Sequence, residues 1–297
     1  MSYGSGLGTQ SPIDLMGIQH PPPPDQVVAA IQAAQGRRTL RFRVIFIATW
    51  IIIVGGILLA LYAGPRFDPS FDLGPIDKSN PNSTPVWVYI LGGVPLTLII
   101  SVVSISIAIV LALAGALGRL SKNALIYGTA SLYVSLVRGT PLIVQIIFVY
   151  YALPQVIPAT ANVPSLYLGI IALSFNYGAY MTEIFRAGII AVPRGQREAA
   201  EALGMREGLV MRRVVLPQAV RIVIPAIGND FISMTKDSAL VSVIGVQELL
   251  WRAQHVGSAN FRNLETLLLA AGVYWVITII LSLFQERLEK RMARGDR

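Results

Sequence analysis

The sequence contains no cysteine, and its only histidines are His20 and His255. Without cysteine the chain can form no disulfide framework and carries no thiol nucleophile, and two distant histidines offer no plausible zinc cluster. We therefore expect no metal site, no cofactor and no catalysis built on these residue types. A Gly-x-x-x-x-Gly-Lys-Ser/Thr phosphate loop is also missing, so energy from ATP would have to come from another protein.

Charged residues are also scarce. They make up 13% of the 297 residues, whereas 54% are hydrophobic, and the mean hydropathy is +0.61. A soluble domain of this size would carry far more charge, so the composition predicts a protein embedded in a lipid bilayer. The net charge of +8 does not indicate a nucleic-acid partner, because a basic stripe needs a water-facing surface and most of this chain has none.

Residues 1–43 show no cleavable signal peptide, since they are polar, rich in glycine and interrupted by Pro21 to Pro24. We expect them to form a largely disordered cytoplasmic tail, with a possible short helix at 25–35. The first apolar segment should then remain in the membrane as an anchor.

Long apolar intervals predict six membrane helices, because about 20 apolar residues cross the hydrocarbon core of a bilayer. They lie at 44–63, 87–118, 134–153, 166–185, 219–245 and 266–285. The segment 64–85 is rich in Pro, Ser and Asn and carries three aspartates, so we expect a water-exposed loop there. The fifth helix contains Asp230, Lys236 and Asp237, and charges at such a depth predict a helix that faces a pore.

The distribution of lysine and arginine predicts the orientation, since these residues collect on the cytoplasmic side. Four arginines between 37 and 43 place the N-terminus inside, which puts the loops 64–85, 154–164 and 251–261 outside. The turn with Arg119 and Lys122, the arginine-rich loop 194–221 and the basic tail 291–297 then fall inside. Both termini are thus predicted to be cytoplasmic, and a model with five spans would put a basic cluster on the wrong side.

The cytoplasmic loop contains a spaced motif. Glu198, Ala199 and Ala200 are followed after three residues by Gly204, and nine further residues lead to Val214, Leu216 and Pro217. This pattern resembles the EAA motif of permease subunits of ABC importers, with Val214 where isoleucine is usual. Flanking segments resemble the polar amino acid branch, of the histidine, glutamine and arginine type: residues 138–142, 176–180, 229–231 and 236–238. The resemblance covers about residues 87–290 and leaves out 1–85.

The resemblance implies an all-α membrane protein of the bacterial cytoplasmic (inner) membrane. A five-helix core at 86–290, with a coupling loop at 194–218, would follow the additional helix 44–63. It also implies transport of polar amino acids with four kinds of partner: an ABC ATPase subunit, a second permease subunit, an extracytoplasmic solute-binding protein and the lipid bilayer. ATP would be hydrolysed by the partner, so the chain itself would not be an enzyme.

Residue types in the motif suit a docking element. The segment 198–203 consists of helix formers, the small Ala199 and Ala200 would let a partner backbone approach, and Gly204 permits a turn. A second short helix is predicted at 207–215, ended by Pro217. The alternative interpretation is an ordinary solvated amphipathic loop.

Polar residues inside two predicted spans are candidates for the substrate path: Asn176, Tyr180, Glu183, Lys236, Asp237 and Ser238. The first three lie at helical spacing and could share one face, whereas Lys236 and Asp237 are adjacent and must point in different directions. A zwitterionic substrate needs one donor and one acceptor. The alternatives are an ion pair of Glu183 with Arg186, helix packing for Asn176, and pairing of Lys236 and Asp237 with neighbouring helices or a second subunit.

Three other functions remain compatible with these features. A secondary transporter would also bury ionisable residues, but the coupling loop would have no role in it. A structural membrane protein would leave the polar residues of 166–245 unexplained. An ABC permease for another small solute would keep the loop and differ only in the substrate path.

Overall fold

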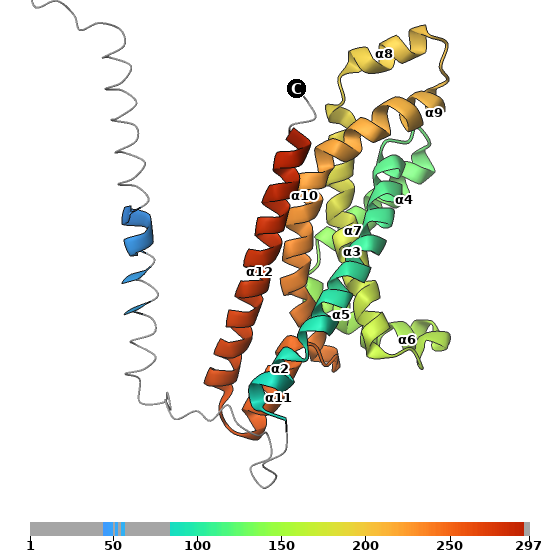
Figure 1. The fold of residues 1–297 in the computed structure, drawn as a ribbon. Helices are drawn as coiled ribbons and strands as arrows, with labels where there is room; N and C mark the ends of the chain where they lie inside the picture. The colour runs from blue at the N-terminus through green and yellow to red at the C-terminus, as the bar shows by residue number, and fades with distance from the viewer. Residues whose placement is uncertain (1–43, 50, 53–54, 57–83, 294–297) are drawn as a thin grey trace, which may run out of the picture. The chain divides into compact units, whose positions relative to one another are not determined.

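The computed structural model describes residues 44–49, 51–52, 55–56 and 84–293, and the chain divides into the units 1–69 and 70–297 (Figure 1). In the first unit, the described residues are helical, in agreement with the predicted helix 44–63. The predicted tail 1–43 and almost all of the loop 64–85 lie outside the described residues.

The second unit is built from helices. Its long elements are α3 (Val94–Arg119), α4 (Ala124–Arg138), α7 (Ser165–Ala191), α10 (Leu216–Asp237) and α12 (Asn263–Ala293). Its shorter elements are α2 (Val86–Leu91), α5 (Leu142–Tyr151), α6 (Leu153–Val156), α8 (Arg194–Ala202), α9 (Glu207–Val210) and α11 (Leu249–Ala259). Short 3₁₀ turns occupy Pro158–Thr160 and Ser238–Ile244.

Helix α7 is the centre of the bundle, since it contacts α3, α10, α5 and α4. Helices α8 and α9 lie at one end of the bundle, and α2 and α11 lie at the opposite end (Figure 1). Among the described residues, Val86–Arg119 and Asn263–Arg291 are long and apolar enough to span a membrane. Helices α7 and α10 have 27 and 22 residues, which is also enough length, but they carry more polar residues.

The predicted straight helix at 134–153 is wrong. Helix α4 ends at Arg138, α5 begins at Leu142, and the two helices are bent by 105°. Pro141 causes the break, because proline lacks the backbone N–H and pushes the residue before it out of the helical conformation. Neither helix alone is long and apolar enough to span a membrane, but α4 and α5 together are, as one broken span.

The predicted end of a short helix before Pro217 is also wrong. Helix α9 continues through a π-helical turn, Met211–Val215, directly into α10. Pro217 lies in the first turn of α10, where proline is tolerated. The fifth predicted helix, 219–245, is shorter than expected, because α10 ends at Asp237 and a 3₁₀ turn leads to Gly245 with a φ of 79°.

Glycines bring several helices close together. At Gly93, between α2 and α3, an added Cβ would lie 2.6 Å from the backbone of Leu249, so a side chain there would displace the start of α11. At Gly178 of α7, a Cβ would lie 2.9 Å from the Cβ of Leu111 in α3. Gly93 is therefore a packing position between α2–α3 and α11.

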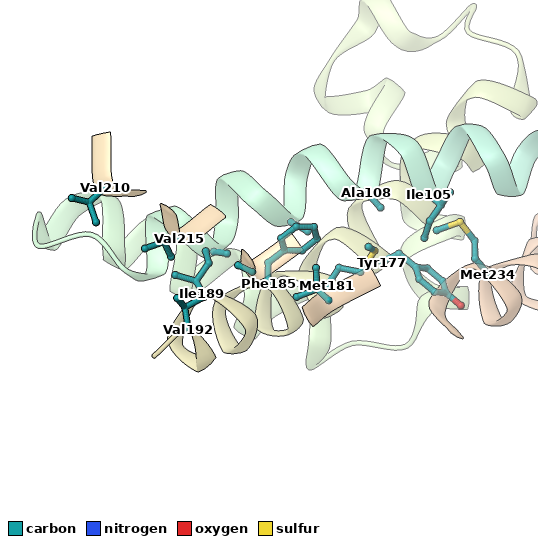
Figure 2. Close-up of a cluster of buried hydrophobic side chains, with 14 of the residues drawn as sticks. Ile105, Ala108, Tyr177, Met181, Phe185, Ile189, Val192, Val210, Val215 and Met234 are labelled. Carbon is teal, nitrogen blue, oxygen red and sulfur yellow. The ribbon is translucent and has the colours of Figure 1, made fainter. Parts of the chain in front are cut away.

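The largest buried cluster runs from the loop region along α3, α7 and α10 (Figure 2). It begins at Val210 and Val215 within the predicted coupling loop, continues through Ile189 and Phe185 of α7, and reaches Met234 near the end of α10. Loop and bundle thus share one apolar core. Two further clusters lie around Leu173 and around Leu249.

Candidate coupling loop and substrate path

The turn at Gly204 has a left-handed conformation, with a φ of 78°. The N–H of Gly204 donates to the carbonyl of Glu201 at 2.8 Å, and the N–H of Met205 donates to the carbonyl of Ala200 at 3.2 Å. These bonds satisfy carbonyls at the end of α8, as in a helix that is capped by a left-handed glycine. The prediction of a turn that ends the first short helix is confirmed.

The two alanines of the motif face opposite environments. Ala199 and Glu198 are exposed, whereas Ala200 is 5% exposed and belongs to the large apolar cluster. The prediction that both alanines are open to a partner backbone is therefore wrong for Ala200. Leu203, next to the turn, is 83% exposed and adds an apolar side chain to the outer surface.

The second half of the motif also has both buried and exposed residues. Val214 and Leu216 are partly buried against the large cluster, and Pro217 is exposed. The guanidinium of Arg197 donates to the carbonyl of Ile189 at 3.0 Å, which attaches α8 to the end of α7. The motif therefore presents an outer surface of Glu198, Ala199, Leu203, Gly204 and Pro217 on a base that is packed into the bundle.

Glu183 lies in an ion-pair network. Its carboxylate is bonded to Arg119 of α3 and, at 2.9 Å, to Arg186 one turn further along α7. The alternative interpretation of Glu183 as a partner of Arg186 is confirmed, and Arg119 extends the pair to a second helix. With two guanidiniums on one carboxylate, Glu183 has little capacity left for a substrate.

Asn176 is buried and takes part in the α4–α5 bend. Its side-chain amide donates to the Oε1 of Gln145 at 3.1 Å. The Nε2 of Gln145 in turn donates to the carbonyl of Val137 at 2.7 Å and to the carbonyl and hydroxyl of Thr140 at 3.1 and 2.8 Å. Gln145 therefore connects the end of α4, the start of α5 and the centre of α7.

Gln145 was not among the residues expected from the sequence. The available signal was a single amide in the otherwise apolar α5, Leu142–Tyr151. Its importance depends on the bend, because its amide donates to the carbonyls of Val137 and Thr140 and to the hydroxyl of Thr140, which the break before α5 places beside it. Asn176 thus joins two helices through a hydrogen bond. Of the two roles considered for it, helix packing and substrate contact, this is helix packing.

Tyr180 lies in a different environment from Asn176 although the two are one turn apart. The ring of Tyr180 is 43% exposed, and the guanidinium of Arg138 stacks over it at 5.2 Å from the centroid. This is a cation–π geometry at the end of α4. The expected common face of Asn176, Tyr180 and Glu183 is therefore divided among three separate interactions.

Lys236 and Asp237 point in different directions, as expected. Lys236 is exposed, whereas Asp237 is partly buried and accepts a hydrogen bond from the hydroxyl of Tyr177 at 2.7 Å.

Asp230, two turns earlier on α10, has a buried Oδ2 with no hydrogen-bond partner among the described residues. Ser238 is fully buried and donates to the carbonyl of Thr235 at 2.8 Å, so its hydroxyl proton is already used.

Glu248, at the opposite end of the bundle from α8, was missed in the sequence. Its side chain is 0% exposed and accepts bonds from the hydroxyl of Tyr274 at 2.6 Å, the hydroxyl of Thr97 at 3.3 Å and the N–H of Trp251 at 2.8 Å. These partners belong to α12, α3 and α11. A buried carboxylate with three donors is a structural junction, and only the tertiary fold shows that it is buried.

A cavity of about 570 Å³ lies in the angle between α4 and α5, against α7. Its walls are apolar and include Val144, Phe148 and Phe175, while Thr140 and Gln145 lie at its polar part. Both polar side chains are already engaged in the hydrogen bonds of the bend. The cavity is thus a groove beside the bend and separate from Asp237.

Residues 104–294 match the family described as binding-protein-dependent transport system inner membrane component. The chain belongs to this family. Among its relatives in Bacillus subtilis (strain 168), the arginine transport system permease protein ArtQ is 39% identical over 70% of this chain and 94% of that protein. The L-cystine transport system permease protein TcyB is 42% identical over 70% of this chain and 88% of that protein. A crystal structure of an amino acid ABC transporter with histidines covers 69% of this chain and 94% of that chain, with 39% identity and a TM-score of 0.63.

Membership in this family confirms the predicted class, an all-α membrane permease of a transport system. The family match begins at residue 104. It includes the coupling loop, α7, α10 and the 3₁₀ turn that begins at Ser238, which together carry the candidate residues of this permease.

We expect Gln145→Leu to lower the unfolding temperature of the purified permease. The substitution leaves the amide of Asn176 and the carbonyl of Thr140 without their partner, while the carbonyl of Val137 keeps only the longer bond from the hydroxyl of Thr140 at 3.5 Å. A buried unpaired group costs about 1–3 kcal/mol. Gln155→Leu is the matched control, because Gln155 is exposed and bonds only to the carbonyl of Tyr151. The effect of Asn176→Leu should be smaller in the Gln145→Leu background than alone, and full additivity would contradict a direct bond between the two side chains.

Proposed function

We propose that this permease subunit imports polar amino acids and is driven by an ABC ATPase that docks on the loop 194–218. The observation that carries the proposal is the division of the EAA motif into two surfaces. Glu198, Ala199 and Leu203 face outward, whereas Ala200 packs into the core that continues along α7 to Met234. A partner that pushes on the outer surface therefore acts on the buried interior of the bundle.

The proposed substrate class rests on the relatives. The names of ArtQ and TcyB specify arginine and L-cystine, and the similar solved structure is an amino acid transporter. Two residues of the chain itself also support this class. The carboxylate of Asp237 suits the ammonium group of an amino acid, and the exposed Lys236 next to it in the sequence suits the carboxylate group. Tyr180, exposed under Arg138, is a further candidate.

The proposed assembly contains a second permease subunit, two copies of the ATPase and a solute-binding protein on the extracytoplasmic side. In this arrangement, both termini and the loop 194–218 face the cytoplasm, and α11 faces the outside. The distribution of lysine and arginine supports this orientation. The domain limits proposed from the sequence are kept: a tail 1–43, a helix 44–63, an outer loop 64–85, a core 86–290 and a tail 291–297.

Uptake in proteoliposomes tests the function. The permease is reconstituted with its ATPase and binding protein, and uptake of labelled arginine, glutamine and cystine is measured with and without ATP. We expect uptake only when ATP and the ATPase are both present. Uptake without the ATPase, driven by an ion gradient, would instead indicate a secondary transporter.

Gly204→Val should weaken the docking of the ATPase. At a φ of 78°, a side chain with a Cβ is strained by about 1–2 kcal/mol, so the free loop of the variant relaxes to another conformation. Docking must then restore the turn, which lowers the affinity about five- to thirtyfold. An added Cβ would meet no described atom within 4 Å, so the strain lies in the backbone conformation. Gly204→Asn is the matched control, since asparagine adopts this conformation more easily. Equal amounts of ATPase co-purified with both variants would contradict a role of the turn.

Asp237→Asn should reduce uptake at least about tenfold while the amount of folded permease stays normal, because a hydrogen bond to a charged group contributes about 1.5–3 kcal/mol. The asparagine oxygen can still accept the bond from Tyr177, so the substitution removes the charge and keeps the local contact. Lys236→Gln should change the ranking among acidic, neutral and basic amino acids.

Glu286→Gln serves as a control for these two variants, since it removes an exposed carboxylate of α12. A structural ion network would instead lower the amount of folded protein for Asp237→Asn. Unchanged uptake in both Asp237→Asn and Lys236→Gln would contradict their place in the substrate path.

A further inference from the structure

Helix α10 connects the two parts of the proposed site. It begins at Leu216, directly after the π-helical turn of the coupling loop, and it ends at Asp237. With 22 residues at 1.5 Å per residue, it spans about 33 Å. A displacement of the loop can reach Asp237 along this helix only if the helix moves as one body.

Pro225 makes α10 weak in its interior. Proline has no backbone N–H, so the carbonyl of Arg221, four residues earlier, loses its helical hydrogen bond, and the ring crowds the same turn. A helix with a missing bond bends more easily at that point than elsewhere. Without a further contact, a push from the loop would bend α10 at Pro225 before it reached Asp237.

A glutamine of α12 forms a hydrogen bond with α10 at Pro225. Gln285 of α12 is 9% exposed, and its Nε2 donates to the carbonyl of Pro225 at 3.1 Å. The same Nε2 donates to the Oε1 of Glu289, one turn further on α12, at 2.9 Å. Glu289 thus holds the amide with its donor side toward α10. The contact joins α12 to α10 at Pro225 itself, one turn after the carbonyl of Arg221 that loses its helical bond.

Gly228 of α10 provides the space for this amide. A Cβ at position 228 would lie 3.0 Å from the Cδ and 3.1 Å from the Cγ of Gln285, so even alanine would press on the side chain. The Oε1 of Gln285 is buried and has no hydrogen-bond partner among the described residues. An unpaired buried oxygen is unfavourable, and packing alone would be served better by an apolar side chain.

We propose that Gln285 is a positioning residue for coupling: it fixes the Pro225 turn of α10 to α12, so that movement of the coupling loop is transmitted to Asp237. The inference rests on the proposed function, since it assumes that the ATPase moves the loop. Among the described residues, the hydrogen bonds of Gln285 go to Pro225 and Glu289, which belong neither to the proposed docking surface nor to the candidate substrate residues. Its removal should therefore separate ATP hydrolysis from uptake and leave both partners bound.

The test compares ATP hydrolysed per amino acid imported in proteoliposomes that contain the whole complex. Gln285→Met keeps the length and packing of the side chain and removes its donors. We expect the ratio to rise about three- to tenfold, the range for loss of a hydrogen bond, while the ATPase rate and the unfolding temperature stay near those of the unchanged protein. Glu286→Gln, at the adjacent exposed position, should leave the ratio unchanged.

Gly228→Ala tests the same contact from α10, because the new methyl group displaces the amide of Gln285 without changing residue 285. It should raise the ratio as well, and the double variant should exceed neither single variant by much. An unchanged ratio in Gln285→Met, or loss of folded protein in both single variants, would overturn the inference in favour of a purely structural role. Failure of the proposed function is distinguishable, because the unchanged complex itself would then show no ATP-dependent uptake.

Discussion

The continuous apolar cluster between the coupling loop and α7 is the contact on which the rest of the structure depends. Ala200, Val210 and Val215 come from the loop region, and Ile189 and Phe185 come from the end of α7. Because protein interiors are close-packed, a base of this kind cannot move without displacing its neighbours. The loop is thus a surface projection of the core, which distinguishes it from a solvated connection between two helices.

Polar contacts then determine how the helices around this core are arranged. Gln145 closes the α4–α5 bend onto Asn176, the carboxylate of Glu183 joins α3 to α7, and the hydroxyl of Tyr177 joins α7 to α10 through Asp237. Each of these bonds begins or ends on α7. In an apolar environment, such bonds are specific because few alternative partners exist. Helix α7 therefore fixes the register of its neighbours by polar contacts and their spacing by apolar ones.

Sequence reasoning was sufficient where a local pattern determines the structure. The apolar intervals located α3, α7 and α12, and the spacing of the motif located the turn at Gly204. It failed at the α4–α5 bend, because hydropathy averages over Pro141 and a run of apolar residues hides the break. It also failed for Gln145, whose role depends on the unpredicted bend and on the amide of Asn176, and for Glu248, whose role depends on hydroxyls from distant segments. The common face expected for Asn176, Tyr180 and Glu183 was wrong because three different neighbours surround that face.

The junction at Glu248 gives the two ends of the bundle different mechanical properties. Around Glu248, hydrogen bonds with defined directions join α3, α11 and α12, and the backbone of Leu249 lies against Gly93 without room for a side chain. At the coupling loop, the contacts are mostly between apolar side chains, which have no preferred direction and hold the loop by close packing alone. A force on the loop would accordingly rotate the helices about the Glu248 end, so that small shifts near the pivot accompany larger ones at the loop.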